Sequence, residues 1–205
     1  MTRSAALIDS FLFIGVFLVL TSAVSAQQCN GLPAAHINLY WRSTESLESP
    51  DQRWEFTSTG PKSSNKPAAL TIRNLENSRS WNVGAIERNG TAFWSDDSKR
   101  LFLRDEYAAD DTKIRVFDVS GLAPKELQRL NSKIRRAIYA QVPSNKTTMW
   151  LHFPEVCFAP QDSSTIFLTA DAPLAPKKGS GPGKDFSMKM QVHLDTLKIV
   201  TAVGH

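Results

Sequence analysis

Apolar and polar residues alternate in short runs along most of this chain, a pattern typical of strands with one buried face. The run Met188–Leu194 is the clearest example, because every second residue in it is apolar. Comparable runs predict strands near residues 53–57, 69–75, 100–104, 113–119, 165–169 and 187–194. The sequence therefore predicts a mainly β fold with antiparallel strands, organised as one domain over residues 27–205.

One segment shows helical periodicity instead. Its four apolar residues recur at spacings of three and four, which places them on one face of a helix. They are Leu127, Leu130, Ile134 and Ile138. Pro124 suits a first helical turn and Pro143 prevents continuation of the helix. We expect one amphipathic helix near residues 124–141, inserted between strands and packed on the sheet.

Three segments share a turn rich in Ser, Pro and Asp that leads into a hydrophobic strand. They are Ser49–Phe56, Trp94–Leu103 and Phe158–Leu168. Proline fixes φ and aspartate caps its own turn, so the chain reverses and re-enters a sheet. A second strand follows each one, and the units start about 46 and about 65 residues apart. The longer spacing has room for the predicted helix, so turn, strand, loop and strand occur three times.

The second of these turns, Trp94-Ser95-Asp96-Asp97-Ser98-Lys99-Arg100, resembles the TolB-type, WD-like β-propeller repeat, whose strand opens with a W-S-P-D-G-K-like turn. The first turn has Glu48 in place of the aromatic residue, and the third has Phe158 there and one extra residue. The resemblance covers about two thirds of the exported chain. It implies four-stranded blades around a central channel, which commonly serve as a platform for binding proteins.

Three such units do not close a ring, since propellers typically have four to eight blades. We therefore expect a small or incomplete propeller with one inserted helix. A fourth, irregular blade built around Ile37–Trp41 is one extension of this hypothesis. The alternative is an ordinary antiparallel sandwich whose turns look alike.

The N-terminus has the pattern of a cleaved secretory signal peptide over residues 1–26. Arg3 supplies the positive charge, Phe11–Leu20 is a ten-residue apolar run, and Val24-Ser25-Ala26 places small residues before the cleavage site. The apolar run is shorter than the roughly 20 residues of a spanning helix. We expect a secreted or periplasmic protein with no stable membrane span after cleavage; the alternative is an uncleaved anchor.

The chain has two cysteines, Cys29 and Cys157. In an oxidising compartment an even pair indicates a disulfide, which here joins the start of the exported chain to a distant segment. The other interpretation is two buried free thiols. Neither cysteine has a second Cys or His at ligand spacing, so no metal site is expected.

Charge gives the candidate binding face. The formal net charge is +4, too weak to argue for nucleic acid. Four cations of the predicted helix lie opposite its apolar face, namely Lys125, Arg129, Lys133 and Arg136. One interpretation is a solvated outer face; the other is a docking face for an anionic partner, either a protein or an anionic component of the cell envelope.

No motif indicates catalysis. The sequence holds no G-x-S-x-G elbow, P-loop or G-x-G-x-x-G. The acidic pairs Asp105-Glu106 and Asp110-Asp111 are expected in a solvated hairpin loop without the spacing of a calcium loop. We therefore expect no catalytic residue, cofactor or metal. The predicted function is an exported, non-enzymatic binding or scaffold protein; the alternative is an inhibitor or a truncated, hydrolase-associated propeller domain.

Overall fold

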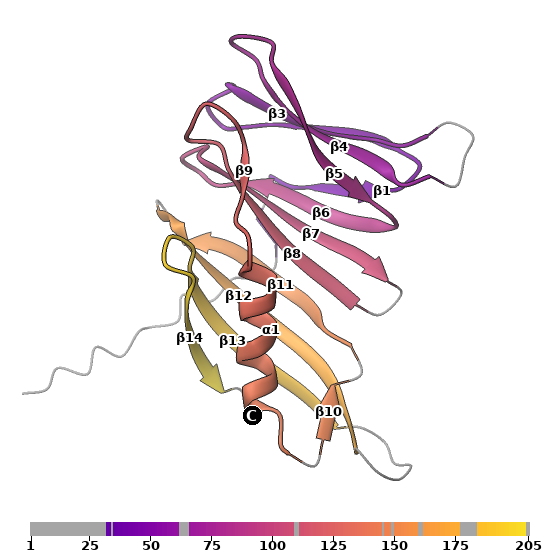
Figure 1. Ribbon diagram of the computed structural model, residues 1–205, viewed down its shortest axis with the longest axis vertical. Helices are drawn as coiled ribbons and strands as arrows, with labels where there is room; N and C mark the ends of the chain where they lie inside the picture. Colours follow the sequence, from indigo (N-terminus) through magenta and orange to yellow (C-terminus); the bar gives the residue numbers. More distant parts are fainter. Residues whose placement is uncertain are drawn as a thin grey trace, which may run out of the picture.

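The computed structural model describes residues 32–33, 35–61, 66–108, 111–144, 146–148, 150–159, 162–176 and 184–203. These residues form three antiparallel sheets and one helix, so the prediction of a mainly β, antiparallel fold is confirmed. The three sheets are stacked in layers in chain order (Figure 1). The predicted signal peptide lies outside the described residues.

The first sheet is a four-stranded meander. Its strands follow the chain in the order β2 (Thr44–Glu48), β3 (Trp54–Thr59), β4 (Ala68–Asn74) and β5 (Ser80–Ile86). Burial alternates along β3 and β4, so one face is apolar and the other polar. Glu55 and Arg73 lie on the polar face, opposite each other in the register.

The second sheet contains the middle turn. Its order is β1 (Ile37–Tyr40), β6 (Asn89–Trp94), β7 (Arg100–Ala108), β8 (Asp111–Asp118) and β9 (Lys125–Glu126). The suggestion of a fourth blade around Ile37–Trp41 is wrong, because β1 pairs antiparallel with β6 and becomes the edge of this sheet.

The third sheet has the same meander with longer strands. It consists of β11 (His152–Ala159), β12 (Asp162–Pro176), β13 (Lys184–His193) and β14 (Lys198–Val203), with the short β10 (Lys146–Thr148) paired to β12. All six strands predicted from the sequence are present, each within a longer or slightly shifted strand. The three turns connect β2 to β3, β6 to β7 and β11 to β12, and a further strand follows each time, so the order of turn, strand, loop and strand is confirmed for the described residues.

Two apolar cores hold the layers together. The first core lies between the first and second sheets and includes Trp54, Phe56 and Leu103. The second core lies between the second and third sheets and includes Phe102 and Phe153. Successive residues of β7 point to opposite faces, so Phe102 and Leu103 enter different cores. The second sheet is therefore buried on both sides, which explains its continuous apolar runs.

The helix α1 (Leu130–Gln141) begins six residues later than the sequence predicts. Lys125 and Glu126 pair with β8 instead of entering a helical turn. Leu130, Ile134 and Ile138 are buried in the second core, as expected from their spacing. Val142, the residue before Pro143, has the extended ψ of 127° that such positions favour and ends the helix.

Candidate functional site

The four cations proposed as a binding face come from three kinds of local structure. Lys133 and Arg136 lie on α1, Arg129 immediately precedes it, and Lys125 lies on β9. The prediction that all four share one helix is therefore wrong for Lys125. All four side chains are nevertheless exposed, because the apolar residues of this region face the second core. We call these four residues the basic face.

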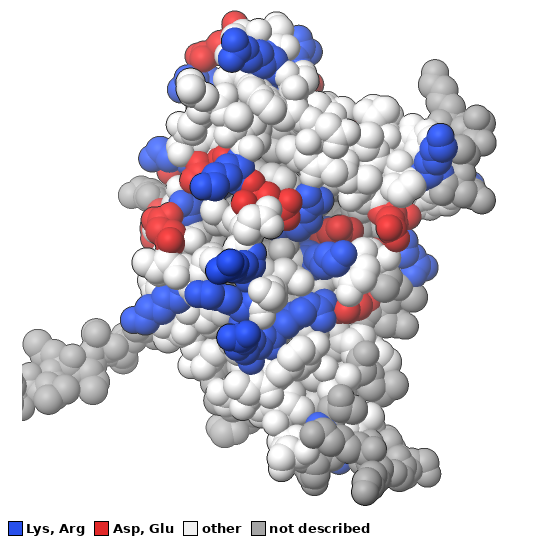
Figure 2. Space-filling view, in the orientation of Figure 1, with Lys and Arg blue, Asp and Glu red and all other residues white. Residues whose placement is uncertain are grey.

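The basic face is not neutralised by the carboxylates of the described residues. No ion pair engages Lys125, Arg129, Lys133 or Arg136 within that part of the chain. Figure 2 shows Lys and Arg side chains gathered over the first part of α1, with carboxylates above them toward the first sheet. The basic face therefore leaves its positive charge available to a partner.

Two neighbouring arginines are tied to acids instead. Arg135 donates to Asp111 at 2.7 Å, and this contact holds the pKa of the Asp111 carboxyl below its usual range although burial opposes the shift. Arg115 makes two hydrogen bonds of 2.9 Å to Glu126 and a third of 2.6 Å to the carbonyl of Val83. These arginines stabilise the scaffold around the basic face and do not add to its free charge.

The start of α1 adds to the positive potential. Arg129 sits at the N-cap with φ 68° and ψ −3°, in the left-handed region. No side chain caps the helix, and its first turn contains no acidic residue. The first N–H groups of a helix have no intrahelical partner and carry the positive end of its dipole. This end of the helix therefore favours negative charge.

A groove lies beside the helix start, with a volume of about 570 Å³. Residues of β7, β8 and β9 form one part of its wall, and Gln128 to Ser132 form another. Its polar side chains come from Asp105, Lys113, Arg115, Glu126, Gln128, Arg129, Asn131 and Ser132. The groove therefore brings acidic and basic groups of the second sheet next to the uncapped helix.

Asp105 is the feature of this groove that the sequence interpretation missed. It lies within β7 and is only 5% exposed, not in a solvated loop as expected. Its Oδ1 atom has no hydrogen-bond partner among the described residues. Burial raises the pKa of Asp105 to about 6, although Arg115 and Lys113 oppose the shift. Extending the alternation of Leu101 and Leu103 by one more step would have placed Asp105 on the same inward face.

The turns form a second polar cluster, which joins the sheets. In the first turn Ser49 donates to Asp51 at 2.6 Å and accepts the N–H of Trp54. Ser95 makes the equivalent bonds in the second turn, to Asp97 at 2.8 Å and from the N–H of Arg100. The two turns are thus alike bond for bond.

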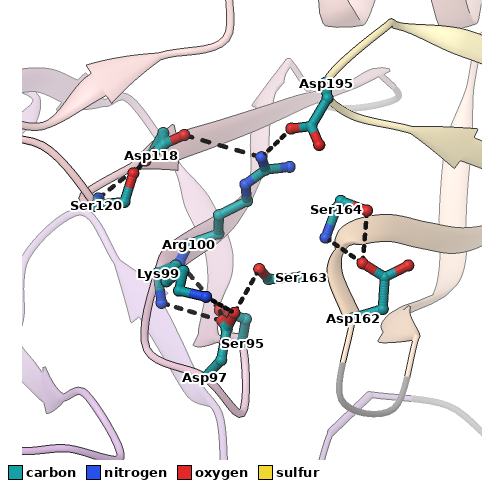
Figure 3. Close-up of polar contacts among 10 residues, drawn as sticks. All are labelled: Ser95, Asp97, Lys99, Arg100, Asp118, Ser120, Asp162, Ser163, Ser164 and Asp195. Atoms are coloured by element: carbon teal, nitrogen blue, oxygen red, sulfur yellow. Dashed lines mark hydrogen bonds and ion pairs between the residues drawn. The ribbon is translucent and has the colours of Figure 1, made fainter.

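Neighbouring turns are also linked to each other, through the residue after the Asp of one turn and the Asp of the preceding turn. Ser98 accepts the N–H of Asp51. Ser163 donates to the carboxylate of Asp97 at 2.7 Å (Figure 3). Arg100 lies between Asp118 and Asp195 and pairs with both. Apart from the pair of Arg100 with Asp118, which lies within the second sheet, these contacts run between the layers and tie them together.

The predicted disulfide falls partly outside the described residues. Cys157 lies on β11 opposite Phe167 of β12, and no described cysteine is a free thiol. Cys29 is not among the described residues, so the pairing of Cys29 with Cys157 stays a prediction. No helix of the described residues is long and apolar enough to cross a membrane.

Comparisons with known proteins add one structural similarity. No protein-family model matches the sequence, and no curated protein matches it. The crystal structure of TolB from Acinetobacter baumannii is similar over 78% of this chain and 44% of that chain, with 9% sequence identity and a TM-score of 0.32. This chain spans less than half the length of that structure.

Proposed function

We propose that this chain is an exported, non-enzymatic binding protein whose propeller-like layers present the basic face to an acidic protein surface. The observation that carries the proposal is that Lys125, Arg129, Lys133 and Arg136 are all exposed and without an ion pair to a described carboxylate. Exposed cations that nothing neutralises raise the encounter rate with an acidic partner.

The helix that carries part of the basic face is firmly packed, which favours a binding role over that of a mobile, solvated segment. Ile134 and Ile138 are fully buried, so α1 is fixed on the second core. Arg135 and Asp111 tie the helix to β8. Cations held on a fixed surface lose less conformational freedom on binding than cations on a mobile segment.

A charge-reversal experiment tests this proposal. The variant R129E/K133E/R136E is compared with a matched control, R79E/R88E/K198E, which changes the net charge equally at exposed positions elsewhere. Binding to a poly-glutamate peptide is measured by calorimetry at low and at high ionic strength. We expect the first variant to bind at least about tenfold more weakly at low ionic strength, with the difference shrinking as salt screens the charges.

The control variant and a second probe, phosphatidylglycerol vesicles, distinguish a specific face from an effect of net charge and an acidic protein from an anionic lipid. Both variants should unfold at nearly the same temperature as the wild type, because exposed charges contribute little to stability. Equal loss of binding in both variants would mean that only net charge matters and would contradict a specific face. Binding to phosphatidylglycerol vesicles but not to poly-glutamate would replace the acidic protein by an anionic lipid surface.

A further inference from the structure

The groove beside the start of α1 contains an unsatisfied acceptor in its wall. Asp105 is only 5% exposed to solvent, and its Oδ1 accepts no hydrogen bond from the described residues. A buried carboxylate oxygen without a donor is costly, and a native protein usually retains one for a reason. Because Asp105 lines the groove, a rotation of its carboxylate toward the groove lets a ligand seated there supply the missing donor.

The surroundings of Asp105 restrict what the donor can be. Lys113 and Arg115 line the same groove and act on the Asp105 carboxyl electrostatically. A ligand ammonium group would meet repulsion from Lys113, whereas Arg115 is already paired with Glu126. Neutral hydroxyl groups can donate to the carboxylate without that penalty. Asp105 therefore favours a hydroxylated ligand over an amine.

The other side of the groove favours an anion. Leu130, Asn131 and Ser132 form the uncapped first turn of α1, and all three line the groove. Arg129 lies beside them with an exposed side chain that pairs with no described carboxylate. A helix N-terminus together with an unpaired arginine is a suitable environment for a carboxylate, sulfate or phosphate group.

We propose that this groove binds a small acidic sugar, whose hydroxyl groups donate to Asp105 and whose anionic group lies at the start of α1 beside Arg129. A volume of about 570 Å³ is within the usual range for a site that takes one small ligand. Asn131 and Gln128 supply further polar groups at the same wall. This site shares Arg129 with the basic face but does not include Lys133 or Arg136, so a variant at Arg136 distinguishes its failure from the failure of the proposed function.

Defined probes test the two halves of the ligand. Glucuronate, glucose and inorganic phosphate are titrated against the protein and followed by calorimetry and by saturation-transfer NMR. We expect glucuronate to bind at least about tenfold more tightly than glucose or phosphate, because only glucuronate offers both hydroxyl donors and a carboxylate. Phosphate binding as tightly as glucuronate, or no binding of glucuronate, would overturn the proposal. Methyl glucuronide that binds as well as glucuronate would identify the end of a glycan as the source, and its exclusion would identify a free sugar.

Three variants locate the binding. Asp105→Asn should weaken glucuronate binding about tenfold or more, because it removes the charged acceptor of the sugar hydroxyl groups. The variant should still fold, because the substitution removes a buried charge that has an unsatisfied oxygen. Asn131→Asp should also weaken binding by placing a negative charge in the first turn, although the same charge stabilises the helix. Arg136→Gln should leave glucuronate binding unchanged while it reduces binding to poly-glutamate. If Asp105→Asn and Asn131→Asp both bind glucuronate like the wild type, the groove is not the site.

Discussion

Asp105 shows how one carboxyl group links the groove to the pH dependence of folding. Its pKa is about 6 in the folded protein and 3.8 as the ordinary value. Between these values the folded state binds more protons than the unfolded state, so stability falls as the pH rises through this interval. The full shift corresponds to at most about 3 kcal/mol. Glu87 and Glu126 reinforce the effect of burial, whereas Lys113 and Arg115 oppose it.

Asp105→Asn should therefore raise the free energy of unfolding above pH 6 by about 1–3 kcal/mol and leave it little changed near pH 3.8. Urea unfolding across this range measures the effect. Asp51, Asp97 and Asp162 have lowered pKa values, so their contributions are lost as the pH falls through about 3.8 and below, which overlaps this window only at its acidic end and with the opposite slope. If the free energy of unfolding of the variant and of the wild type changed with pH in the same way, the pKa of Asp105 would not differ between the folded and unfolded states.

The Asp of the repeated turn should matter more than its neighbour in sequence. Asp97 accepts hydrogen bonds from Ser95, from the N–H of Lys99 and from Ser163. We expect Asp97→Ala to lower the free energy of unfolding by about 1–3 kcal/mol, since it removes several hydrogen bonds to a charged acceptor. Asp96→Ala is the control; it is exposed, so we expect a change within about 0.5 kcal/mol. Similar losses in both variants would contradict a structural role for this turn.

Single residues also show where sequence reasoning succeeded and where it failed. The Ser and Asp side chains of the turns were identified because their hydrogen bonds are local and depend on spacing alone. Asp105 was assigned to a loop, since the cluster of acids around Tyr107 looks polar. The alternation of Leu101 and Leu103 indicates its inward face, but the depth of its burial depends on the layer packed against β7.

At the scale of elements, the start of α1 is set by a strained residue. Arg129 occupies the left-handed region, which costs a residue with a β-carbon about 1 kcal/mol and costs glycine almost nothing. Arg129→Gly should therefore stabilise the protein by about 1 kcal/mol in denaturant unfolding at high salt. Arg129→Ala removes the same charge but keeps the β-carbon, so it should not stabilise. A larger gain for alanine than for glycine would contradict the assigned backbone geometry.

Elements were predictable where local patterns suffice. The six strands and the apolar stripe of α1 follow from periodicity, and Pro143 marked the helix end. The helix start was placed too early because Lys125 and Glu126 pair with β8, an interaction between segments separated by a loop. The edge strand β1 was misassigned for the same reason, since its partner β6 lies about 50 residues away.

At the scale of the whole molecule, the shared second sheet should make unfolding cooperative. The fluorescence of Trp54 and Trp94 reports on the first core, because both residues lie in it. Far-ultraviolet circular dichroism reports on the strands of all three sheets. We expect the two signals to follow one transition in urea. Leu103→Ala in the first core and Phe153→Ala in the second should each shift that single transition, by about 2–5 kcal/mol. Separate transitions for the two signals would show that the first sheet unfolds alone.

The links between turns make the two ends of the stack of sheets different. Each link runs from the residue after the Asp of a later turn back to the Asp of the earlier one. A fourth unit added by gene duplication after the third would find Asp162 already present as its partner. A unit added before the first would have to supply its own Asp for Gln52, and it would also have to cover the polar face that carries Glu55 and Arg73. Tandem growth of this array is therefore easier at its C-terminal end than at its N-terminal end.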